Sequence, residues 1–217
     1  MDNFNNSVFI SLNGENTMVL ILGGGNGAFI KATTLLKRGF IVHCLSEEYT
    51  TKFKELSFNY SNLLLLNEIF TENMLANYHL VVICTSDNVF NDKVRSICNN
   101  QKKIFIDSTV PEVSKAILCA SRITKNIALG IRINGKNPKS SVFLCNKGRK
   151  YYEKFDDYVE FTTMVRLNIT KIDKKNEILD YINSDDFLFF FNQGVAKEIL
   201  ELFYPDILNE ICDWNNL

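Results

Sequence analysis

Short apolar runs alternate with longer segments of helical period over the first half of the chain. The predicted strands are residues 8–12, 18–22, 40–45, 63–66, 80–84 and 103–107. Segments such as 26–39 and 87–103 separate them and have the apolar spacing of helices. This alternation is typical of βαβ units, which build a parallel sheet covered by helices. The run over 80–84 is apolar at every position, as expected of a central strand buried on both faces.

The pattern changes after Pro111. Residues 114–123 and 126–133 are predicted to form two further strands with a turn between them, and the remainder is charged and helical in period. The predicted class is α/β. Its parts are a Rossmann-like parallel sheet domain over residues 1–112, a strand-rich connector over 113–139, and a small helical C-terminal domain over 140–217.

A glycine-rich segment, GGGNGA, joins the strand at 18–22 to the helix that follows it. In a dinucleotide-binding loop the first glycine permits the tight turn, the second lets backbone approach a pyrophosphate, and a small third residue lets helix and strand pack closely. The helix would then present its free N–H groups to the phosphate. An ordinary turn is the alternative. The predicted cofactor contacts in this loop are Gly23, Gly25, Asn26 and Gly27.

Two further strand ends are expected at the same edge. Glu47 and Glu48 follow the second strand, where an acid binds the ribose of NAD, although they could instead be first-turn acids of a helix. No Arg or Lys is present at that strand end, which favours NAD over NADP. Thr85, Ser86 and Asp87 follow the strand at 80–84 and are also predicted to line the cofactor, with Asp87 favoured as a helix N-cap.

Composition narrows the class of partners. The chain has 24 Lys and Arg residues and 25 Asp and Glu residues, so its net charge is close to zero. An overall positive potential that would attract nucleic acid or an anionic membrane is therefore not expected. Six cysteines are scattered without a CxxC motif, which predicts a reducing, cytoplasmic location. No signal peptide and no apolar run of transmembrane length is recognised. The two histidines lie in or beside strands, and no metal ligand set is predicted.

Three ordered blocks of sequence resemble the precorrin-2 dehydrogenases, which form sirohydrochlorin with NAD and in several members also insert iron. The first block is VFISLNGENTMVLILGGGNGAFIKATTLLKRGFIVHCL, the second is VVICTSDNVFNDKV, and the third is IALGIRINGKNP. The segment FNQGVAKEILELF is similar to the terminal helix of that family. The likeness covers nearly the whole chain. The first block matches the family at Ala28, Lys31, Ala32, Leu35, Leu36 and Gly39, the second at Ser86, Asp87, Asn91 and Val94, and the third at Asn134, Gly135 and Pro138.

The resemblance implies NAD-dependent oxidation of precorrin-2 by a homodimer paired through residues 113–134. That family usually carries Asn-Val-x-Asp-x-Pro after the fifth strand, whereas this chain has IDSTVP, with Asp107 in place of the Asn. Asp107 still ends a strand at the edge where α/β folds bind ligands, so it is the candidate proton acceptor. Capping of the following turn is the alternative role for Asp107.

A substrate with many carboxylates requires cationic groups. The predicted substrate contacts are Arg132, Asn134, Gly135 and Lys136, within a segment that also holds Arg122, Lys125 and Lys139. Metal insertion ranks below dehydrogenation, since it would rest mainly on Asp107. A catalytically weakened, NAD-binding Rossmann dimer with a sensing or regulatory role is the competing hypothesis.

Overall fold

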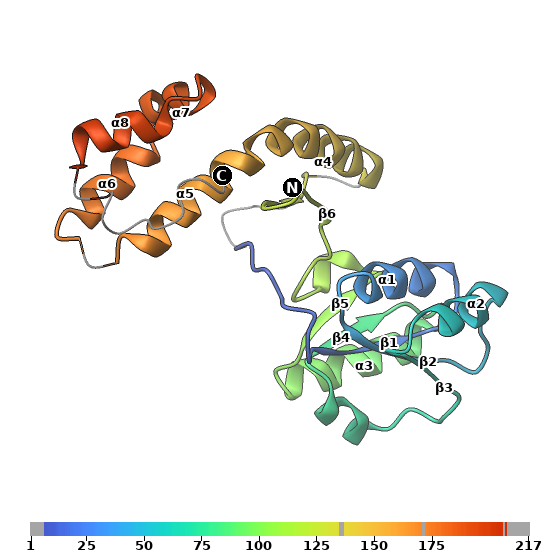
Figure 1. Ribbon diagram of the computed structural model, residues 1–217. Helices are drawn as coiled ribbons and strands as arrows, with labels where there is room; N and C mark the ends of the chain where they lie inside the picture. The colour runs from blue at the N-terminus through green and yellow to red at the C-terminus, as the bar shows by residue number, and fades with distance from the viewer. Residues whose placement is uncertain (1–6, 135–136, 171, 206, 208–217) are drawn as a thin grey trace. The chain divides into compact units, whose positions relative to one another are not determined.

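The computed structural model describes residues 7–134, 137–170, 172–205 and 207 (Figure 1). The chain divides after Leu118 into two compact units, and each is described by itself. The first unit holds the glycine loop, and the second holds a strand pair and the C-terminal helices. The predicted domain limits at 112 and 139 stay a prediction. Across the part of the chain that the structure covers, no helix has the length and apolar character required to cross a membrane.

The first unit is built on a five-stranded sheet in the order β3-β2-β1-β4-β5. Every neighbouring pair is parallel, as the predicted βαβ alternation requires. This order reverses direction between β1 and β4, which is the arrangement of a Rossmann-like sheet. The predicted α/β fold class is therefore confirmed. The strands are β1 (Met18–Leu22), β2 (Ile41–Leu45), β3 (Leu63–Leu66), β4 (Leu80–Ile83) and β5 (Ile104–Asp107).

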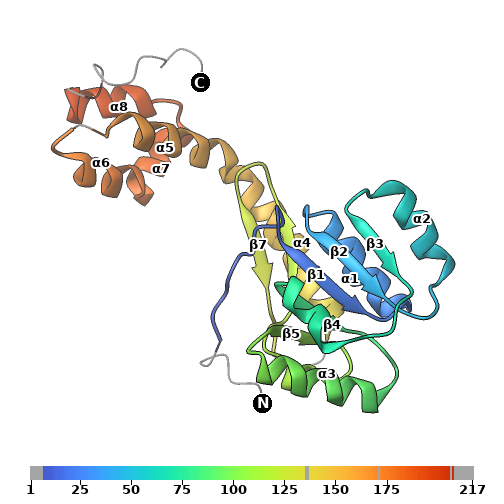
Figure 2. The same ribbon diagram turned by 90° about the horizontal axis from the view of Figure 1, so that it is seen from below.

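Helices cover both faces of this sheet (Figure 2). On one face the apolar sides of α1 (Asn26–Leu36) and α2 (Thr51–Asn59) pack against alternate strand residues. On the other face α3 (Asn88–Asn100) and the 3-10 helix η2 (Glu72–Asn77) do the same. All four residues of β4 are buried, as its continuous apolar sequence predicts. A short 3-10 helix, η3 (Pro111–Val113), follows β5.

The predicted strand at residues 8–12 is wrong. The structure has no strand there, and the side chains of Val8 and Phe9 are 79% and 68% exposed. An apolar run becomes a strand only where a neighbour accepts its backbone hydrogen bonds. Within the described residues, β3 and β5 end the sheet on its two sides, and neither pairs with this segment.

The second unit begins with a two-stranded antiparallel sheet of β6 (Ala120–Ile123) and β7 (Ala128–Ile131). The predicted strand from 114 is shorter than expected, since residues 114–119 lie outside β6. Helix α4 (Pro138–Tyr152) packs on this pair, and the Cys145 thiol contacts the carbonyl oxygens of Ala120 and Leu129. A Cβ on Gly148 would lie 2.5 Å from a terminal methyl of the Leu129 side chain, so α4 approaches β7 closely at this position.

A buried carboxylate fixes the turn between β6 and β7. Asp156 follows the 3-10 helix η4 (Glu153–Phe155) and begins α5 (Asp156–Asn168). Its carboxylate accepts hydrogen bonds from the Thr124 hydroxyl at 2.6 Å and from the N–H groups of Lys125 and Asn126 at 3.0 and 2.8 Å. Burial opposes ionisation of Asp156, but these donors outweigh it and lower the pKa of its carboxyl.

The remaining helices form a small bundle with its own core. They are α5, α6 (Lys175–Ile182), α7 (Asp185–Asn192) and α8 (Ala196–Phe203). Phe187 lies fully buried in that core, in ring contact with Phe161 and Tyr181. Gly194 separates α7 from α8 with a φ of 74°, a left-handed conformation that favours glycine. Gly194 therefore ends α7.

The substitution Phe187→Ala should lower the free energy of unfolding of the helical bundle by about 3 to 5 kcal/mol, because it leaves a cavity in the core. Phe189, two residues further along α7, is 59% exposed, so Phe189→Ala should change it by no more than about 0.5 kcal/mol. Urea unfolding followed by circular dichroism measures both values. Equal effects of the two substitutions would contradict this packing.

Candidate functional site

The glycine loop turns sharply between β1 and α1 at the carboxyl edge of the sheet. The Gly23 N–H donates to the Leu45 carbonyl at 2.9 Å, which ties the loop to the end of β2. Gly23 has a φ of 123°, and a Cβ there would lie 2.7 Å from the Cys84 carbonyl oxygen at the end of β4. Both the backbone conformation and the lack of space therefore require glycine at this position.

Gly24 packs against the loop that follows β2. A Cβ on Gly24 would lie 2.0 Å from the Glu48 carbonyl oxygen and 2.8 Å from the Ser46 hydroxyl oxygen. The Thr50 N–H donates to the Gly24 carbonyl at 3.1 Å, and the Ser46 hydroxyl donates to the Glu48 carbonyl at 2.7 Å. These contacts bring the ends of β1 and β2 together, so the glycine loop and the segment that holds Glu47 and Glu48 are neighbours.

The other side of the glycine loop is open. A Cβ on Gly25 or Gly27 would meet no atom within 4 Å, and both residues are exposed, as is Asn26. Gly25 is the N-cap of α1, so no side chain caps this helix, and the first turn holds no acid. Ala28 is fully buried against the sheet. This arrangement leaves backbone N–H groups at the start of α1 available to an anion.

Glu47 and Glu48 are both exposed beside this loop. Helix α2 begins at Thr51 and has no acid in its first turn, so the alternative interpretation of the two glutamates as first-turn helix acids is wrong. Their place after β2 is the one expected of a ribose-binding acid in this fold. That role stays a prediction for both residues.

The end of β4 is held by a small network around Thr85. Its hydroxyl donates to the Asn91 side-chain oxygen at 2.6 Å and accepts the Asp87 N–H at 3.2 Å, while the Asn91 amide donates to the Thr85 carbonyl. The Asp87 carboxylate accepts the Phe90 N–H at 3.0 Å, so the predicted N-cap of α3 is confirmed. Ser86 is exposed at this edge. Contact of these residues with a cofactor stays a prediction.

Asp107 ends β5 and is only 1% exposed. One carboxylate oxygen accepts hydrogen bonds from the N–H groups of Thr109 and Val110 at 2.7 and 3.0 Å and from the Thr109 hydroxyl at 2.6 Å. The other oxygen forms an ion pair with Arg95 from α3. The capping role weighed for this residue is thus present. Its role as a proton acceptor stays a prediction.

The surroundings of Asp107 set its protonation state. Burial acts to raise the pKa of its carboxyl, but the bonds from Thr109, Val110 and Arg95 outweigh burial, so the pKa lies below its ordinary value. The sequence did not identify Arg95, because its spacing on α3 pairs it as readily with Asp92, to which it also binds. Ser108 lies beside Asp107, and its hydroxyl is 3.1 Å from the Cys84 thiol.

The predicted substrate contacts belong to the second unit or lie outside the residues that the structure describes. Arg132 is half-buried and Asn134 exposed, whereas Gly135 and Lys136 lie outside the described residues. Arg122 donates to the Asn146 side chain and to the Ser121 carbonyl, and Lys125 pairs with Glu160. Among the residues described, no group of three or more His, Cys, Asp or Glu side chains could hold a metal ion.

The sheet order and the glycine loop define a Rossmann-like protein in which no side chain caps the start of α1. A family model described as "Putative NAD(P)-binding" matches residues 8–120, more than half of the chain. The chain belongs to this family of NAD(P)-binding proteins.

Two curated relatives are siroheme synthases. The protein of Blochmanniella floridana is 31% identical over 133 residues, which cover 60% of this chain and 28% of that protein. The protein of Actinobacillus pleuropneumoniae serotype 3 (strain JL03) is 29% identical over 97 residues, or 45% of this chain and 19% of that protein. The chain thus matches less than a third of either relative.

A solved structure shares the fold. It is that of SirC, precorrin-2 dehydrogenase, with a TM-score of 0.62 and 21% sequence identity, and the match covers 82% of this chain and 90% of that one. The likeness extends beyond the family model and into the second unit. At this level of identity it shows the fold alone.

The two sides of the glycine loop predict different results for two substitutions. Gly24→Ala should lower the free energy of unfolding by about 1 to 3 kcal/mol, because its Cβ meets the Glu48 carbonyl. Gly27→Ala, in the open first turn of α1, should leave it unchanged or raise it by up to about 1 kcal/mol. Thermal unfolding monitored at a β-sheet signal measures both. A Gly24→Ala protein as stable as the parent would contradict the close approach of the two loops.

Proposed function

We propose that the chain is an NAD-dependent dehydrogenase that oxidises precorrin-2 to sirohydrochlorin. The observation that carries the proposal is the open start of α1, where Gly25 and Gly27 leave room for a ligand and no side chain caps the helix. The two siroheme synthases and the SirC fold support the choice of substrate. Oxidation of a tetrapyrrole is thus the one activity that accounts both for the glycine loop and for the proteins that this chain is similar to.

The residues fit a dinucleotide in three respects. The N–H groups of the first turn of α1 would bind the pyrophosphate, with Gly23, Gly25, Asn26 and Gly27 forming the cradle. Glu47 or Glu48 would accept the ribose hydroxyls. Thr85, Ser86 and Asp87 would line the opposite side of the cofactor, at the end of β4. The acids after β2 and the lack of Arg or Lys between Ser46 and Thr51 favour NAD over NADP.

Dehydrogenation needs a hydride acceptor and a proton acceptor. Bound NAD supplies the first. We propose Asp107 for the second, because it is the carboxylate at the end of β5 and its lowered pKa keeps it ionised at neutral pH. The same low pKa makes it a weak base, and its ion pair with Arg95 would have to loosen for a proton to be accepted.

The partners follow from the substrate. Arg132, Asn134, Gly135 and Lys136 are proposed to bind carboxylates of the macrocycle. We also propose a homodimer paired through residues 113–134 and a cytoplasmic location, with no nucleic-acid or membrane partner. Metal insertion ranks below dehydrogenation in this proposal, since it would again depend on Asp107.

A second candidate is a dinucleotide-binding protein of sensing or regulatory function that has lost turnover. One observation favours it, which is that every oxygen of the Asp107 carboxylate is already bonded within the protein. The two candidates agree on cofactor binding and differ on catalysis.

Anaerobic incubation with precorrin-2 and NAD should yield sirohydrochlorin, followed by its absorbance, and NADP should support a slower rate. Gly27→Ala, which keeps the fold, should weaken NAD binding and reduce the rate. Binding of NAD without any turnover would overturn the dehydrogenase and support the sensing protein. Absence of NAD binding, measured by calorimetry, would overturn both.

The role of Asp107 is tested by the pH profile of kcat/KM. Removing the cation in Arg95→Gln should raise the pKa of Asp107, so the loss of activity on the acid side should begin at a higher pH than in the parent. Arg95→Lys retains the positive charge, so its pH profile of kcat/KM should match that of the parent.

The double variant Arg95→Gln with Asp107→Asn replaces the ion pair by a neutral hydrogen-bonding pair and guards against loss of the fold. Its rate should fall by about 10²- to 10⁴-fold if Asp107 accepts the proton. A folded double variant with the parent rate would leave Asp107 with its capping role only.

A further inference from the structure

One face of α4 carries an unusual concentration of positive charge. Residues 138–152 include three lysines and one arginine and no acid, although the whole chain has a formal net charge of -1. Lys139, Lys147 and Lys150 belong to α4, and Lys154 follows in η4. All four lysines are exposed, and among the described residues no carboxylate forms an ion pair with them.

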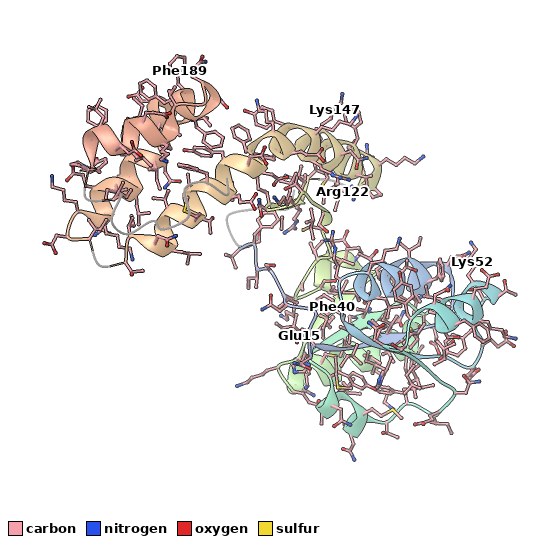
Figure 3. All side chains as sticks on the ribbon, viewed as in Figure 1. Glu15, Phe40, Lys52, Arg122, Lys147 and Phe189 are labelled. Carbon is pink, nitrogen blue, oxygen red and sulfur yellow. The ribbon has the colours of Figure 1, made fainter. Side chains whose placement is uncertain are left out.

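These lysines share one side of the helix. Lys139, Phe143, Lys147, Lys150 and Lys154 follow each other at spacings of four, four, three and four residues, which places them on one face. Cys145 and Gly148, which pack on the strand pair, lie on the opposite face. Figure 3 shows Lys147 on the outer side of α4 and Arg122 on the inner side. We name this set of five residues the α4 basic stripe.

Aromatic rings lie between the charges. Phe143 is 58% exposed, and the ammonium of Lys147 lies 5.7 Å from the centre of its ring. Tyr151, beside the stripe, is 55% exposed, and the Lys154 ammonium lies 4.3 Å from its ring centre. A cation–π contact holds the ammonium near the ring without removing its charge. The surface therefore offers flat apolar area and positive charge within one helix face.

This combination has the complementary chemistry of a planar polycarboxylate. Lysine ammonium groups on flexible stems adapt to carboxylates at varied positions, and an exposed ring can stack on a flat macrocycle. We infer that the α4 basic stripe, in the second unit, is a docking surface for the carboxylate-rich tetrapyrrole. The inference rests on the proposed function for its choice of ligand.

The physical effect of such a surface is capture by long-range attraction. Positive charge on one face raises the local concentration of an anionic ligand and its association rate, and salt weakens the effect. The stripe should therefore act on kcat/KM and leave kcat unchanged, since no stripe residue takes part in the chemical step.

The test uses uroporphyrin, a stable macrocycle with carboxylates around its rim, titrated into the full chain by fluorescence anisotropy. The double variant Lys147→Gln with Lys150→Gln should weaken binding roughly 3- to 10-fold, as expected for the loss of two exposed charge contacts. The matched control, Lys174→Gln with Lys175→Gln, makes the same charge change at the start of α6 and should leave binding unchanged. Phe143→Leu should weaken binding if the ring stacks.

Equal affinity of the stripe variant and the control would overturn the inference. Tighter, lysine-dependent binding of anionic vesicles or duplex DNA than of uroporphyrin would overturn the choice of ligand. The proposed function can fail separately: a chain that binds uroporphyrin through the stripe yet does not oxidise precorrin-2 retains the docking surface without the dehydrogenase. An active chain with kcat/KM unchanged in the stripe variant would reject the docking surface alone.

Discussion

The close approach of three backbone segments at the carboxyl edge of the sheet underlies the candidate site. Gly23 lies against the carbonyl of Cys84, and Gly24 lies against that of Glu48. Since those carbonyls occupy the places where side chains would stand, the loop can be tightly held only with glycines. With Gly23 and Gly24 held in this way, Gly25 and the start of α1 lie on the exposed side of the loop. The loop is thus packed closely at Gly23 and Gly24 and has free space beside Gly25 and Gly27.

Much of this architecture follows from local pattern. Alternating apolar and helical segments identified the strands of the parallel sheet, since every buried strand carries its own apolar run. Residues 8–12 show the limit of that signal, because an apolar run does not reveal whether a partner strand exists. The Arg95–Asp107 pair shows another limit, since a contact between a helix and a strand end leaves no periodic trace. Asp87 was predictable because an N-cap is bonded within its own helix.

The two faces of α4 differ in what they contact. On the inner face, Gly148 and the Cys145 thiol lie close to the strand pair, while Asp156 fixes the turn between β6 and β7. A two-stranded sheet is marginal by itself, so the helix and the buried carboxylate supply the support that further strands would give. The lysines on the outer face are exposed, and among the described residues no carboxylate forms an ion pair with them.

The Arg95–Asp107 contact has a consequence for how this chain can diverge. Loss of either partner alone leaves a poorly compensated charge at a largely buried position, which is costly, whereas replacement of both by neutral groups is tolerated more easily. The two positions should therefore change together in descendants of this sequence. Loss of the arginine on α3 alone would free only one oxygen of the Asp107 carboxylate, because the other accepts hydrogen bonds from Thr109 and Val110. The pair thus restricts the order in which mutations at this site can accumulate.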